Sequence, residues 1–66
     1  MALERRQREV LNALRSFGGQ ATTAAIAEKT GLNVNGVTQT LGALVRYVEF
    51  VSGKGGDATW RIIRSS

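Results

Sequence analysis

Cysteine, histidine and proline are all absent from this chain of 66 residues. Without cysteine and histidine the chain lacks disulfides and the ligands that hold most structural and catalytic metals, so we expect neither a metal nor another cofactor. The missing imidazole also removes the usual activator of serine nucleophiles. The only carboxylates are scattered along the chain, at Glu4, Glu9, Glu28, Glu49 and Asp57. The composition therefore argues against an enzyme.

Long apolar runs are also missing. No stretch reaches the roughly 18 apolar residues of a membrane span, and residues 1–6 lead into polar sequence rather than into the apolar core of a signal peptide. We therefore expect a cytoplasmic protein that does not enter a membrane. A hydrophobic fraction of 42% in 66 residues suits one apolar core, so we expect a single domain over residues 1–66. No small-molecule site is evident.

The charge is unbalanced toward the positive. Nine Lys and Arg residues face five Asp and Glu residues, which gives a net charge of +4 and a pI of about 10.8. Such a balance favours a polyanionic partner such as nucleic acid, although many small domains are equally basic.

The first two of three predicted helices are separated by glycines. Apolar residues at helical spacing predict a first helix over 3–17, which Gly18 and Gly19 end; they are Leu3, Val10, Leu11, Leu14 and Phe17. A short extended connector at 20–22 follows. Thr22 is placed to cap a second helix over 23–30, and Gly31 is placed to end it.

Asn33 is placed to cap a third helix, predicted over 34–47. Its apolar face consists of Val37, Leu41, Leu44 and Val48. The dipeptide at 35–36, Asn-Gly, is typical of hairpin turns, but the helical spacing downstream outweighs it.

The last part of the chain predicts a β hairpin over 49–63. Two β-prone runs flank the glycine-rich segment 52–57, for which we expect a long flexible tip. Phe50, Trp60 and Ile62 are expected to face inward, with Arg61 facing solvent. The predicted fold is thus mainly α with a small β hairpin.

Two segments carry a resemblance to a known family. IAEKTGL at 26–32, followed by VTQTLGAL at 37–44, resembles the pattern of winged helix-turn-helix domains in bacterial and archaeal transcription regulators. Ala27 matches the small residue where the two helices touch, and Gly31 matches the turn. With the first helix before these segments and the hairpin after them, the resemblance covers nearly the whole chain. It implies a winged helix, with a three-helix core and a C-terminal wing.

The resemblance also implies a function, namely duplex DNA binding by a transcription regulator or an accessory DNA-binding module associated with the nucleoid. The third helix would enter the major groove, and the wing would contact the backbone or the minor groove. The implied base-reading residues are Asn33, Asn35, Thr38 and Gln39. The implied backbone contacts are Thr22, Thr23, Arg46, Lys54, Arg61 and Arg64. The side chain of Asn or Gln can form two hydrogen bonds with the edge of one adenine, although such residues are also common on solvated helices.

One departure from the family pattern matters for affinity. The third helix carries no charge from Val34 to Val45, so the common contact of arginine with guanine is missing there. Cations around the hairpin would have to supply the affinity, because the first helix of most such domains, which here carries Arg5, Arg6, Arg8 and Arg15, faces away from DNA.

Two alternatives remain open. The uncharged third helix also suits a winged helix that acts as a protein–protein interaction module. A homodimer is a further expectation, since such regulators often read two half-sites, and Leu3 is its candidate contact. ATTA at 21–24 together with Trp60 is similar to a branch of the family that binds Z-form nucleic acid, but Gly42 and Thr38 replace that branch's tyrosine and asparagine. We therefore interpret Trp60 as a core residue.

Overall fold

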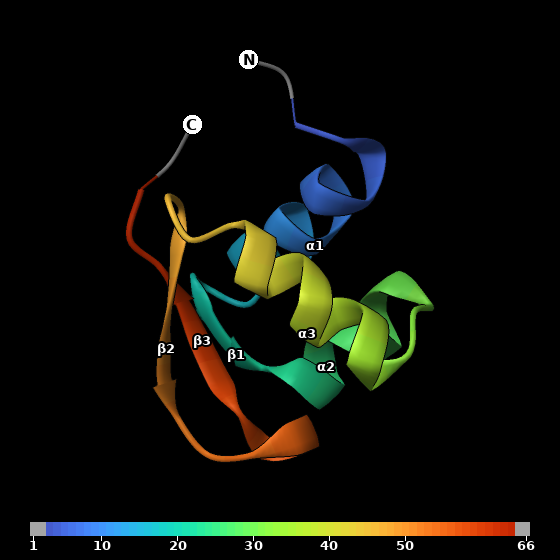
Figure 1. Ribbon diagram of the computed structural model, residues 1–66, viewed down its shortest axis with the longest axis vertical. Coiled ribbons are helices and arrows are strands. Elements are labelled where there is room, and N and C mark those ends of the chain that lie inside the picture. Colours follow the sequence, from blue (N-terminus) through green and yellow to red (C-terminus); the bar gives the residue numbers. More distant parts are fainter. Residues whose placement is uncertain (1–2, 65–66) are drawn as a thin grey trace.

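Three helices and a three-stranded antiparallel sheet make up the fold of the computed structural model, which describes residues 3–64 (Figure 1). The elements follow in the order α1 (Arg5–Ser16), β1 (Gln20–Thr22), α2 (Thr23–Thr30), α3 (Val34–Ala43), β2 (Val48–Ser52), the 3₁₀ turn η1 (Gly55–Asp57) and β3 (Thr59–Ile62). The three predicted helices and the C-terminal hairpin are confirmed. The strand β1 was predicted only as an extended connector.

Helix α1 is shorter than the predicted 3–17. It begins after Glu4, whose backbone N–H donates to Oε1 of Gln7 at 3.0 Å. It ends at Ser16, and the N–H of Gly19 donates to the carbonyl of Leu14 at 3.0 Å. Leu3 precedes the helix and packs, half-buried, against the apolar core. The apolar pattern thus extends beyond the hydrogen-bonded helix.

The predicted cap and end of α2 are both confirmed. Oγ1 of Thr22 accepts the backbone N–H of Ala25 at 3.1 Å. At the other end Gly31 has a φ of +77°, a left-handed conformation that glycine adopts without steric cost, and its N–H donates to the carbonyl of Ala27.

Helix α3 begins as predicted but ends at Ala43, four residues before the predicted boundary at 47. The N–H of Leu44 donates to the carbonyl of Leu41 at 3.0 Å, which tightens the last turn. Leu44, which begins the turn at 44–47, and Val48, which follows it, are nevertheless buried. The apolar residues at positions 44 and 48 therefore continue the helical spacing because both are buried in the core, although the helix has already ended.

The sheet has the strand order β1-β3-β2, with β3 in the centre. Trp60 lies opposite Ala21 of β1 and opposite Phe50 of β2, so β3 joins the N-terminal half of the chain to the hairpin. Phe50 is 51% exposed, and the expectation that it faces into the core is wrong. Its ring covers Trp60 edge-on, with ring centroids 5.5 Å apart, instead of entering the core.

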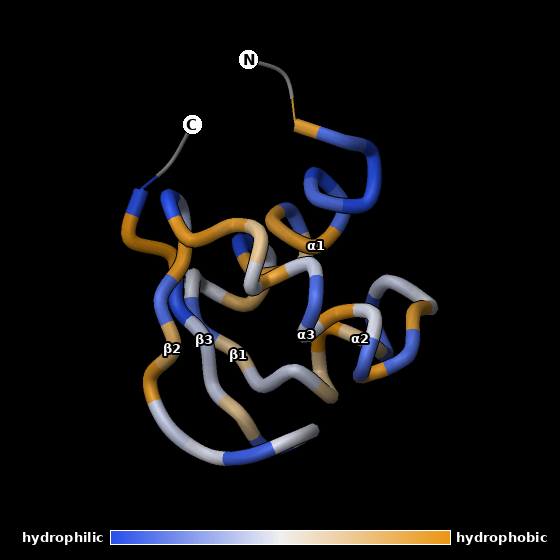
Figure 2. Tube along the Cα trace, viewed as in Figure 1, coloured by the Kyte–Doolittle hydropathy of each residue, from blue (hydrophilic) through white to orange (hydrophobic). Residues whose placement is uncertain are grey.

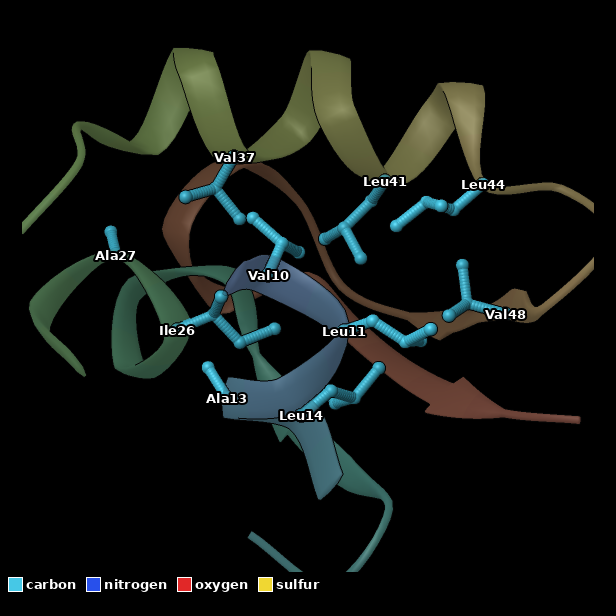
Figure 3. Close-up of a cluster of buried hydrophobic side chains, with 10 residues drawn as sticks. All are labelled: Val10, Leu11, Ala13, Leu14, Ile26, Ala27, Val37, Leu41, Leu44 and Val48. Atoms are coloured by element: carbon cyan, nitrogen blue, oxygen red, sulfur yellow. The ribbon is translucent and has the colours of Figure 1, made fainter. Parts of the chain in front are cut away.

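The core lies where α3 crosses α1 and α2 (Figure 3). Val37 and Leu41 of α3, and Leu44 just after it, point toward α1, α2 and the start of β2 (Figure 3). All ten residues of this cluster are buried: Val10, Leu11, Ala13, Leu14, Ile26, Ala27, Val37, Leu41, Leu44 and Val48. This packing turns the opposite side of α3 toward solvent.

The loop of the hairpin is folded back toward α2 and does not extend as a long tip; its flexibility stays a prediction. It contains η1 and lies close to the start of α2 (Figure 1). A Cβ placed on Gly56 would lie 3.4 Å from the Cβ of Ala24 and 3.9 Å from Cγ2 of Val34. Gly53 has a φ of +92°, and a Cβ there would collide with the carbonyl of Asp57. The glycines thus permit close packing in this loop.

Candidate nucleic-acid interface

The exposed face of α3 is uncharged and rich in hydrogen-bonding groups. It consists of Asn35, Thr38, Gln39, Gly42 and Ala43, all exposed. Within residues 3–64 the side chains of Asn35, Thr38 and Gln39 form no hydrogen bond. Thr40, on the core side, is 8% exposed and donates instead to the carbonyl of Gly36 at 2.8 Å. We therefore name these five exposed residues the α3 face, and three of them have polar groups available to a partner.

Asn33 differs from the other predicted base-reading residues. Its Oδ1 accepts the backbone N–H of Gly36 at 2.6 Å and caps α3. A paired bond to adenine needs that oxygen as acceptor and the amide nitrogen as donor. Asn33 is exposed, and its cap uses one of the two lone pairs of that oxygen. Asn33 therefore caps α3, and its role in base reading stays a prediction.

Thr23 is fully buried, and the expectation that its side chain contacts a phosphate is wrong. Its Oγ1 donates to the carbonyl of Ala58 at 3.0 Å and accepts Nε1–H of Trp60 at 3.0 Å. The missed signal is the tryptophan, because the N–H of a half-buried indole usually has an acceptor, and Thr23 supplies it. Thr22 is half-buried, and its hydroxyl oxygen caps α2.

The predicted cations around the hairpin fall into two groups. Arg46, Lys54 and Arg64 are exposed, and their side chains form no hydrogen bond or ion pair within the described part of the chain. Arg61 is exposed but pairs with Glu49, with Nη2 and Oε2 3.0 Å apart, on the sheet surface away from the core. Its charge is thereby partly neutralised. The first three cations are therefore more available to a phosphate than Arg61.

One cation of α1 lies beside the α3 face, contrary to the expectation that the arginines of the first helix face away from it. Arg6 and Gln39 line the same groove between α1 and α3, which has a volume of about 210 Å³. The residues that line it are Glu4, Arg6, Gln7, Gln39, Thr40 and Ala43. Sequence reasoning missed this proximity because it depends on how α1 and α3 cross.

Other features of the described residues carry less information. A second groove, of about 300 Å³, lies between α1 and α2 and includes the opposite charges of Glu9 and Lys29. Residues 3–64 contain no group of three or more potential metal-ligating side chains. In the same range, no helix has the length and apolar character needed to cross a membrane.

Several large apolar side chains are exposed, which bears on protein contacts. They are Phe17, Val45, Phe50, Val51 and Ile63. Val45, just past the end of α3, is 69% exposed. Leu3, the candidate dimer contact, is half-buried against the protein's own core, and the dimer stays a prediction.

Comparisons with protein-family models, with curated protein sequences and with solved structures find no match to this chain. The functional interpretation therefore rests on the residues and geometry of the chain itself. The relevant geometry is the uncharged α3 face, which lies beside Arg6 of α1.

Proposed function

We propose that this domain is a winged helix that binds duplex DNA, with α3 in the major groove and the β2–β3 hairpin as the wing on the backbone or in the minor groove. The observation that carries the proposal is the α3 face, whose amide and hydroxyl groups are exposed and have no partner within residues 3–64. The net charge of +4 supports a polyanionic partner. The corresponding role is that of a cytoplasmic, nucleoid-associated regulator or accessory DNA-binding module.

The dimensions of α3 suit this role. Its 10 residues span about 15 Å, and the major groove admits an α-helix. Asn35 and Gln39 stand four positions apart and therefore share one side of the helix. Each can bond an adenine edge through its amide, while the methyl group of Thr38 can contact a thymine methyl group. The α3 face therefore favours A·T pairs.

Affinity, in this proposal, comes from phosphate contacts. Arg46, Lys54 and Arg64 are exposed and unpaired in the described residues, and none of them belongs to α3. Contacts to phosphates alone give dissociation constants in the micromolar range or weaker at physiological salt. We expect this strength on random duplexes, with a steep loss of affinity as salt rises.

Two substitutions separate phosphate binding from base reading. Lys54→Ala should weaken binding to every duplex and lower the log–log salt slope by about one, because one phosphate contact is lost. Lys29→Ala is the matched control, since it removes the same charge from a groove between α1 and α2. Fluorescence anisotropy on a random duplex at several salt concentrations measures both. Equal salt slopes for the two variants would show that Lys54 does not contact a phosphate of the bound duplex.

Gln39→Ala tests base reading. On random duplexes its affinity should stay close to that of the unaltered protein. On a preferred site, selected from a randomised duplex pool, it should lose about 1–3 kcal/mol of binding free energy. The matched control is Gln20→Ala, which makes the same neutral change at an exposed position in β1. A domain that shows no binding to any duplex at low salt would contradict the proposed function.

A protein–protein interaction module is the second candidate function. The exposed Val45 at the end of the uncharged α3 favours it, because charged residues are depleted at the centres of protein interfaces. Salt distinguishes the two functions, since a largely apolar contact loses little affinity as salt rises. Substitutions in the α3 face that disrupt a protein complex, but leave every duplex titration unchanged, would favour this second function.

A further inference from the structure

The four arginines of α1 differ in their surroundings. Arg5 pairs with Glu9 at 3.9 Å, Arg8 donates to the carbonyl of Leu3 at 3.2 Å, and Arg15 donates to Oδ1 of Asn12 at 3.1 Å. The side chain of Arg6 forms no hydrogen bond or ion pair within residues 3–64. It is the one α1 arginine whose guanidinium no described neighbour engages.

Stability of the helix does not account for Arg6. The first turn of α1 contains no acidic residue, and Arg6 stands near the positive end of the helix dipole, where a cation is unfavourable. Figure 2 shows this end of α1 as a hydrophilic segment. A residue that breaks a local preference without a compensating contact is a candidate for function.

The groove between α1 and α3 places Arg6 next to the proposed DNA site. Gln39 and Ala43, one turn apart on α3, line it from one side, and Arg6 and Gln7 line it from the other. The α3 face itself has no charge. Arg6 is therefore a cation that the fold, and not the sequence of α3, brings to this face.

We propose that Arg6 is a DNA-backbone contact, and that the groove between α1 and α3 receives the phosphate next to the base that Gln39 reads. The inference rests on the proposed function and adds a second element, α1, to the DNA site. An arginine guanidinium carries five donors and suits a phosphate, whose oxygens it can bond in pairs. The contact between Arg6 and the DNA phosphate would then hold the DNA backbone next to Gln39, on the side that faces α1.

Glu4 allows a second test of this proposal, because removing its negative charge should change DNA affinity in the opposite direction from removing the charge of Arg6. It lines the same groove as Arg6, and its carboxylate is exposed. A phosphate in the groove would be repelled by this carboxylate. Removing the charge of Glu4 should therefore strengthen binding, while removing the charge of Arg6 should weaken it.

The experiment compares Arg6→Gln, Glu4→Gln and the matched control Arg5→Gln in the full chain. Arg5 neighbours Arg6 in sequence, but its side chain is 88% exposed and lies outside the groove. The probe is a labelled random-sequence duplex, titrated by fluorescence anisotropy at several KCl concentrations. Thermal melts of each variant verify that the fold is retained, and Arg6→Lys tests whether a positive charge restores binding.

Arg6→Gln should weaken binding about eightfold at about 0.1 M salt and lower the salt slope by about 0.9, the contribution of one phosphate contact. Arg5→Gln should weaken it less than about twofold, and Glu4→Gln should strengthen it about two- to fivefold. Arg6→Lys should keep the slope of the unaltered protein.

The failures of the two proposals are distinguishable. Equal losses for Arg6→Gln and Arg5→Gln, or no gain for Glu4→Gln, would overturn the groove contact while DNA binding itself stands. An unaltered protein that binds no duplex at low salt would overturn both proposals.

Discussion

Thr23 links three parts of the molecule through one side chain. Its backbone N–H and its hydroxyl both donate to the carbonyl of Ala58, at 2.8 and 3.0 Å, and its hydroxyl oxygen accepts the indole N–H of Trp60. The residue is fully buried, so water cannot replace these partners. The hairpin is thereby held to the first turn of α2.

Thr23→Val should test this link. Valine has a similar shape but leaves the indole N–H of Trp60 without its acceptor, which costs about 1–3 kcal/mol of unfolding free energy. Thr38→Val is the matched control, because Thr38 is exposed and has no hydrogen-bond partner in residues 3–64. Chemical denaturation followed by tryptophan fluorescence measures both. Equal stabilities of the two variants would show that the Thr23 bonds contribute nothing net.

Leu41→Ala should create a cavity in the core. The side chain is fully buried in the apolar cluster that α3 forms with α1 and α2, and leucine-to-alanine changes at such sites cost about 2–5 kcal/mol. Val45→Ala, at a position that is 69% exposed, should change stability by less than about 0.5 kcal/mol. Thermal melts provide the comparison. An unchanged melting temperature for Leu41→Ala would contradict the packing shown in Figure 3.

At the scale of the elements, two glycines at helices should respond oppositely to alanine. Gly42 lies inside α3, and a Cβ there would meet no atom within 4 Å, so Gly42→Ala should stabilise the protein by about 1 kcal/mol. Gly31 ends α2 with a φ of +77°, so Gly31→Ala should destabilise it by about 1 kcal/mol. Denaturation midpoints measure the signs, and a shift in the same direction for both would contradict the backbone conformations.

Local signals explain which elements could be predicted. Thr22, Asn33 and Gly31 act within one turn of chain, and all three caps are confirmed. Strand β1 escaped prediction because it has three residues and its pairing partner, Trp60 in β3, is far away in sequence. The end of α3 was misplaced because Val48 continues the apolar spacing from the next strand.

The sequence predicted which residues of α3 are exposed, but it did not predict how residues of different elements lie relative to one another in the candidate site. The positions of Asn35, Thr38 and Gln39 on the exposed side of α3 follow from helical periodicity. The burial of Thr23 and the position of Arg6 beside Gln39 depend on packing between separate elements. No local pattern in the sequence reports such contacts.

For the whole molecule, the distribution of charge is the main electrostatic feature. The chain carries a net charge of +4, and the described residues form two ion pairs, both exposed. Exposed pairs contribute little to stability, about 0–1 kcal/mol each. Repulsion among the remaining cations therefore acts against the folded state at low salt, and a bound polyanion would relieve it.

Salt should therefore act in opposite directions on folding and on DNA binding. Raising KCl from about 0.01 M to about 0.15 M shortens the screening length from about 30 Å to about 8 Å, so repulsion among the cations falls and the melting temperature of the free protein should rise. Over the same range the affinity for a random duplex should fall, because counterions compete for the phosphates. Melts and anisotropy titrations in identical buffers measure the two trends. A melting temperature that falls with added KCl would mean that attractive pairs, such as Arg61 with Glu49, outweigh the net charge, and the cations would then be engaged within the fold and less available to DNA.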